Sequence, residues 1–266
     1  MRCRWGVIYP LATQADWEQG LFAGNPWAHV EIDLETGSFV ELENPLATPE
    51  SLYAMCDPEW MLEHLRDDLA MQLAVYAGDP DYGEPGMIGE LDRPKVERLA
   101  EVLDFHFDWG ADTDQRRQAA MLLNRYGQRA TIFILEKARA FTQSAGKTLL
   151  TVLNYTARTD HFRGSIVAWD GVRRDQEILD HLSARSVPLF DMNAVHQREY
   201  QQAGGTYHEY LSRYMVGGDG HYNPRGNHFF AYTLKDKLLE LLDPKPLPYQ
   251  DRGRDTVDFS RYLPNA

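Results

Sequence analysis

The stretch Lys147–Asn154, KTLLTVLN, is a short run of apolar and β-branched residues that ends on a polar side chain. Such a run is typical of a strand that is buried on both faces of a parallel sheet. A long helical segment at 114–144 precedes it, and another at 176–186 leads into a shorter apolar strand at 187–192. Because helices and strands alternate here, the sequence predicts an α/β fold.

A glycine-rich stretch at 217–227, GGDGHYNPRGN, carries the clearest functional signal. The carboxylate of Asp219 stands two residues before the imidazole of His221, and Gly220 frees the backbone between them to turn. In this arrangement Asp219 can hold Nδ1 of His221, which leaves Nε2 to take a proton from a nucleophile or from water. The stretch is therefore a candidate catalytic loop of a hydrolase.

The same residues also suit an ordinary turn before a helix. Asn223 and Pro224 fit the N-cap and the first position of an amphipathic helix that runs to Leu242. In that interpretation Asp219 and His221 only satisfy backbone groups of the loop. Spacing alone leaves both interpretations open.

The block Asp219–Asn227 resembles the last motif of the SGNH (GDSL-like) hydrolase superfamily, in which Asp and His precede an Asn-containing helix start. The resemblance covers about 147–242. It implies a flavodoxin-like three-layer α/β/α fold and a Ser-His-Asp triad that acts on esters, thioesters or acylated sugars. It assigns His221 as the general base and Asp219 as its orienting carboxylate, and it implies no cofactor.

The family's Gly-Asp-Ser nucleophile motif near the first strand has no counterpart in this chain. The resemblance therefore implies a fold without its first strand, and we expect the nucleophilic serine to lie upstream of Met1. The expected activity is that of an ester hydrolase or acyl (O-acetyl) transferase, with a small-molecule ester or an acylated carbohydrate as its partner. The 266 residues alone would then lack the nucleophile.

Three further polar residues are candidates for support or substrate binding. Asn154 ends the first strand near the expected site, and Asn223 can support the catalytic loop. Arg225 follows the loop and can orient a carboxylate or a sugar acid, or it is a surface residue. Aromatic side chains near the motif suit an acyl or sugar pocket and equally suit core packing: Trp169, Tyr207, Tyr210, Tyr214, Tyr222 and Phe229.

Two other classes of function remain as alternatives. A metal-dependent hydrolase could draw its ligands from four histidines and two aspartates of the last third: His196, His208, His221, His228, Asp191 and Asp219. No His-x-x-x-His pair occurs among them, so we predict no metal site. The other alternative is a non-catalytic, SGNH-like binding domain.

The first part of the chain predicts an elaboration on this core. Apolar and polar residues alternate at 29–33 and 37–42, and this pattern predicts a β-hairpin. Asp57 is then expected to cap one helix that carries a single apolar stripe of Met61, Leu65, Leu69 and Leu73. Glycines and prolines at 78–94 predict a long loop. We therefore expect an elaboration at 1–110, the C-terminal part of the hydrolase core at 111–245 and a tail at 246–266.

Composition narrows the class of partner. The 266 residues carry a formal net charge of -13 and 43% hydrophobic residues, which predicts a globular protein with no basic field for nucleic acid. No apolar run is long enough for a membrane span, and the start of the chain shows no signal-peptide pattern, so a cytoplasmic location is the default expectation. Cys3 and Cys56 are too few for a disulfide framework.

Overall fold

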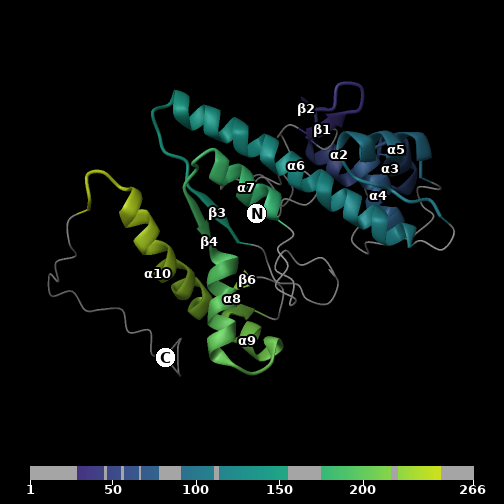
Figure 1. Cartoon of the computed structure of the whole chain (residues 1–266). Helices are drawn as coiled ribbons and strands as arrows, with labels where there is room; N and C mark the ends of the chain where they lie inside the picture. The colour runs from purple at the N-terminus through teal and green to yellow at the C-terminus, as the bar shows by residue number, and fades with distance from the viewer. Residues whose placement is uncertain are drawn as a thin grey trace. The chain divides into compact units, whose positions relative to one another are not determined.

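The computed structural model describes residues 29–44, 47–54, 57–65, 67–77, 91–110, 114–154, 175–216 and 221–246. The chain divides into two compact units, Met1–Gly146 and Lys147–Ala266. The described residues form a mixed α/β structure whose sheets each have two strands (Figure 1). Within these ranges, no helix has both the length and the apolar character to span a membrane.

The first unit begins with an antiparallel hairpin, and helices follow it: β1 (His29–Asp33), β2 (Ser38–Leu42), α2 (Pro49–Ala54), α3 (Pro58–Leu65), α4 (Leu69–Ala77), α5 (Arg93–Val102) and α6 (Gln115–Ser144). The hairpin turn contains Gly37, whose φ of 70° lies in the left-handed region that favours glycine. Oδ1 of Asp33 accepts a hydrogen bond from the backbone N–H of Glu35 at 2.8 Å. Strands β1 and β2 pair antiparallel, so the hairpin prediction is confirmed. Both signals behind the prediction, the alternation of residues and the turn, are local in the sequence.

Helix α6 supplies much of the core of the first unit, and the helix predicted at 114–144 is confirmed. Oδ1 of Asp114 caps its first turn by accepting from the backbone N–H of Arg117 at 3.0 Å. Its buried side chains pack with those of α4 and α5: Leu73, Val96, Leu99, Leu122, Leu123 and Tyr126. The hairpin joins this core where the ring of Phe39 meets that of Tyr126 edge-on at 5.5 Å. Helix α6 thus belongs to the first unit, Met1–Gly146, whereas the boundary predicted from the sequence lies after residue 110.

The single helix expected from residue 57 onward is wrong, because the chain forms α3 and α4 with a break between them. Asp57 does cap α3, since its Oδ1 accepts from the backbone N–H of Glu59 at 2.9 Å. Asp68 starts α4 in the same way, accepting from the backbone N–H of Met71 at 2.8 Å. A second capping aspartate therefore outweighs the apolar periodicity.

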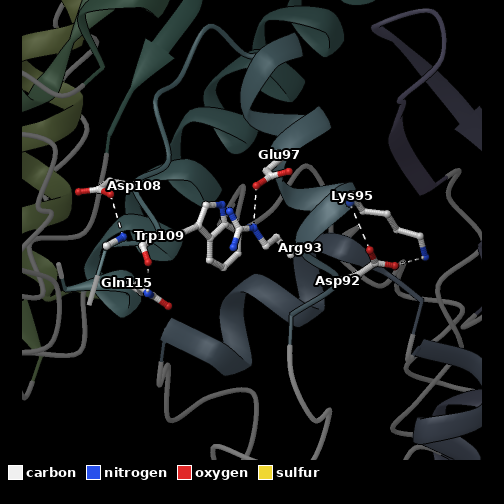
Figure 2. Close-up of polar contacts among 8 residues, drawn as sticks. Asp92, Arg93, Lys95, Glu97, Asp108, Trp109 and Gln115 are labelled. Carbon is white, nitrogen blue, oxygen red and sulfur yellow. Dashed lines mark hydrogen bonds and ion pairs between the residues drawn. The ribbon is translucent and has the colours of Figure 1, made fainter. Parts of the chain in front are cut away.

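Polar contacts around Trp109 join the starts of α5 and α6 (Figure 2). The guanidinium of Arg93 lies 4.9 Å from the centre of the indole ring, and its Nε donates to Glu97 at 2.7 Å. Nε2 of Gln115 donates to the backbone carbonyl of Trp109 at 3.2 Å. Arg93 begins α5, so the end of the loop predicted at 78–94 is helical, and residues 78–90 lie outside the described ranges.

The second unit contains these elements: β3 (Thr151–Leu153), α7 (Gln176–Ala184), β4 (Leu189–Asp191), α8 (Met192–Ala203), α9 (Tyr207–Tyr214), β5 (Met215–Val216), β6 (His221–Tyr222) and α10 (Pro224–Leu241). Strands β3 and β4 are parallel, as the sequence predicts. Strand β3 is shorter than expected, and Val152 is 36% exposed while Thr151 and Leu153 are buried. The expectation of a strand buried on both faces is therefore wrong, because the face that carries Val152 is open.

Candidate functional site

The candidate site is built at the carboxyl end of the parallel strands. Strand β3 pairs with β4 so that Leu153 stands opposite Asp191, which places Asn154 at the same edge. Oδ1 of Asp191 caps α8 by accepting from the backbone N–H groups of Asn193 at 3.1 Å and Ala194 at 3.2 Å. This is the edge at which open α/β sheets usually bind their ligands.

Strand β6 contains the predicted base, and its second residue contacts this edge. His221 and Tyr222 form β6, which pairs antiparallel with β5. The hydroxyl of Tyr222 donates a hydrogen bond to Oδ1 of Asn154 at 3.1 Å. Because successive side chains of a strand point to opposite faces, His221 points away from the half-buried Tyr222, and its ring is exposed to solvent. No hydroxyl of a described serine hydrogen-bonds to this ring.

Asn223 holds the next turn of the chain in place. Its Oδ1 accepts from the backbone N–H of Gly226 at 2.9 Å and caps α10, and its Nδ2 donates to the carbonyl of Arg213 at 3.0 Å. Its backbone N–H also donates to the carbonyl of Tyr214 at 2.9 Å. The predicted helix start is found at this residue, whereas residues 217–220 of the loop that it is expected to support lie outside the described ranges.

Arg225 lies on the first turn of α10 over an aromatic ring. Its guanidinium carbon is 5.5 Å from the centre of the Tyr214 ring, and the hydroxyl of Tyr214 donates to Oε1 of Glu199 at 3.2 Å. Burial raises the pKa of Tyr214, with Glu199 adding to the effect and Arg225 opposing it. Arg225 is therefore engaged with the protein rather than being a plain surface residue.

A half-buried histidine of α8, which the sequence suggests only as a possible metal ligand, contacts the tyrosine of β6. His196, on α8, makes two short hydrogen bonds, from Nδ1 to the hydroxyl of Tyr210 at 2.7 Å and from Nε2 to the hydroxyl of Tyr222 at 2.6 Å. Its ring also stacks on that of Tyr222, with centres 5.6 Å apart. Burial lowers its pKa from 6.5 to about 4, so the ring is neutral at pH 7.

The predicted aromatic set packs as core around this histidine. Tyr210 and Tyr214 are 2% and 5% exposed, and Phe229 packs against them. Trp169 lies outside the described residues, as do the side chains of Tyr207 and His208. Of the two alternatives for these rings, core packing therefore holds for Tyr210 and Tyr214.

Asp219, the predicted orienting carboxylate, lies outside the described residues. The structure places His221 in β6 and Asn223 and Arg225 at the start of α10, and it joins Asn154 to Tyr222, the residue after His221. Within the described part of the chain, no three His, Cys, Asp or Glu side chains stand close enough to hold a metal ion.

Two substitutions of Asn223 distinguish the contributions that its two side-chain hydrogen bonds make to stability. Asn223→Ala loses both bonds and is expected to lower the free energy of unfolding by about 2 kcal/mol. Asn223→Ser keeps a capping oxygen but has no group for the carbonyl of Arg213, so we expect about half that loss. Urea denaturation measures both values. Equal losses in the two variants would contradict the capping role.

The lowered pKa of the half-buried His196 predicts a pH dependence of stability. Between pH 6.5 and about 4 the unfolded chain binds a proton that the folded chain does not. The free energy of unfolding therefore falls as the pH is lowered through this window, by about 3 kcal/mol from this residue. His196→Gln cannot titrate, so its urea-denaturation stability should fall less steeply over the same range. Parallel curves for the two proteins would show that His196 titrates normally.

No protein-family model, no curated protein and no solved structure matches this chain at the level required for a significant hit.

Proposed function

We propose that the second unit is part of an SGNH-like ester hydrolase or acyl transferase with a flavodoxin-like three-layer fold. In this proposal His221 is the general base, Asp219 orients its ring, and the substrate is a small-molecule ester or an acylated carbohydrate. The observation that carries the proposal is the hydrogen bond between Tyr222 and Asn154. It ties the strand of an exposed histidine to the carboxyl end of a parallel strand, where α/β enzymes bind substrates.

The exposure of His221 supports a role in proton transfer. A general base must be reachable by the group whose proton it removes. The backbone next to His221 is anchored, because Asn223 caps α10 immediately after β6 and donates a hydrogen bond to the carbonyl of Arg213. A solvent-facing ring on an anchored strand is accessible to a substrate, as a general base must be.

The chemistry follows from these roles. Nε2 of His221 takes the proton of a serine hydroxyl while the serine oxygen attacks the ester carbonyl carbon. The imidazolium then gives this proton to the leaving alcohol as the carbon–oxygen bond breaks, which leaves an acyl-enzyme. Water or a sugar hydroxyl, activated by the same ring, takes the acyl group in the second step. Asn154 and Arg225 are the candidates for binding the substrate.

Hydrolysis of p-nitrophenyl acetate tests this proposal. The protein, supplied with any residues that naturally precede Met1, is expected to release p-nitrophenolate at a rate that EDTA does not change. Loss of the rate with EDTA and its return with added Zn²⁺ or Mn²⁺ would favour the metal-dependent alternative. Absence of any turnover with acetyl, longer acyl or acetylated sugar esters would favour the non-catalytic binding domain.

A further inference from the structure

His196 joins three elements of the second unit through its two ring nitrogens, and through Tyr222 it is linked to the residue that follows β3. It lies on α8 and bonds to Tyr210 of α9 and to Tyr222 of β6, and Tyr222 in turn bonds to Asn154 after β3. We call these four residues the His196 network. Its members come from parts of the chain as far apart as residues 154 and 222, so the network fixes tertiary rather than local structure.

The directions of the hydrogen bonds follow from the number of protons. The single hydroxyl proton of Tyr222 is donated to Oδ1 of Asn154, so its oxygen must accept from Nε2–H of His196. A neutral imidazole has one N–H, so Nδ1 is an acceptor and takes the hydroxyl proton of Tyr210. The network therefore specifies the Nε2–H tautomer.

This fixed direction determines which group Asn154 presents to solvent. Because Oδ1 accepts from Tyr222, the Nδ2 amide with its two donors is the end of the carboxamide left for other partners. Asn154 is exposed, so these donors are accessible. The orientation of Asn154 is thus linked, through the hydroxyl of Tyr222, to the tautomer of a histidine that it does not touch.

We infer that His196 is a positioning residue that acts through Tyr222. By fixing this hydroxyl, His196 orients the carboxamide of Asn154 and holds the strand that carries His221. This inference rests on the proposed function, because the residues that are positioned are those of the proposed site. A ring that served only to fill space would need neither of its two hydrogen bonds.

Two matched substitutions separate positioning from packing. In His196→Gln the side-chain amide lies near the place of Nε2 and can donate to Tyr222, whereas in His196→Asn it lies near Nδ1 and reaches only Tyr210. With a p-nitrophenyl ester, below the temperature at which either variant unfolds, we expect kcat of His196→Asn to fall about tenfold to a hundredfold. We expect kcat of His196→Gln to stay within a few-fold of that of the parent. The control His106→Gln, at an exposed histidine of the first unit, should have the kcat of the parent. Equal kcat values for the Asn and Gln variants would overturn the inference.

Nitrogen-15 NMR tests the network without relying on activity. At pH 7 the ring of His196 is expected to show the neutral Nε2–H tautomer. The side-chain amide signals of Asn154 are expected to shift in Tyr222→Phe and to stay in place in Tyr232→Phe, a matched change at an exposed tyrosine. The Nδ1–H tautomer, or unchanged Asn154 signals in Tyr222→Phe, would overturn the inference. A protein with the expected spectra but no esterase activity would contradict the proposed function alone.

Discussion

His221→Ala is expected to lower kcat for ester hydrolysis by about 10²- to 10⁴-fold, because it removes the group that accepts the nucleophile's proton. The side chain is exposed, so its loss leaves no cavity in the core. The melting temperature and the far-UV circular dichroism spectrum should therefore match those of the parent. Steady-state kinetics and a thermal melt on the same preparation measure both effects.

His228→Ala is the matched control for this result. His228 is also exposed and lies on α10 a few residues after the site, where its ring stacks on that of Tyr232. Its removal should leave kcat within about twofold of the parent, as expected for a surface substitution. If His221→Ala kept full activity, or if both variants lost activity equally, His221 would not be the general base.

Gly226→Ala is expected to destabilise the protein by about 3 kcal/mol, at the upper end of the usual cost of overpacking. Gly226 is buried on the first turn of α10, where an added Cβ would overlap the backbone oxygen of Tyr214 and come 2.5 Å from Cδ1 of Tyr222. The oxygen cannot retreat freely, because it accepts the backbone N–H of Asn223 at 2.9 Å. Urea denaturation measures the loss.

Gly127→Ala is the matched control for this second substitution. Gly127 is also a helical glycine, on α6, but an added Cβ would meet no atom within 4 Å. Alanine should there raise the free energy of unfolding by about 0.5–1 kcal/mol, because glycine is the poorer helix former. Destabilisation by Gly127→Ala, or a neutral Gly226→Ala, would contradict the packing described at the two positions.

Features with local causes were predictable from the sequence. The starts of α6 and α10 follow from the N-capping side chains of Asp114 and Asn223, and the hairpin follows from the turn at Gly37. The exposure of Val152 was not predictable, because the same apolar run fits a covered or an open face. Helix α8, MNAVHQREYQQA, was missed because it carries few apolar residues.

The candidate site was predictable only in part. The motif at 217–227 indicates His221, Asn223 and Arg225 as candidates, because these residues are neighbours in sequence. The role of His196 depends on hydroxyls from two other elements, and no spacing along the chain encodes such contacts. The one available signal was that a histidine and several tyrosines occur together in the last third of the chain, and this pattern fits core packing as well.

Labelling with a serine-reactive fluorophosphonate tests the central claim most directly. The reagent is applied to the 266-residue chain and to a form that includes any residues that naturally precede Met1, each with His221 intact and as His221→Ala. Adducts are located by peptide mass spectrometry. The account predicts one serine adduct whose formation depends on His221. No adduct in an esterase-active protein, or an adduct that forms equally fast in His221→Ala, would contradict it.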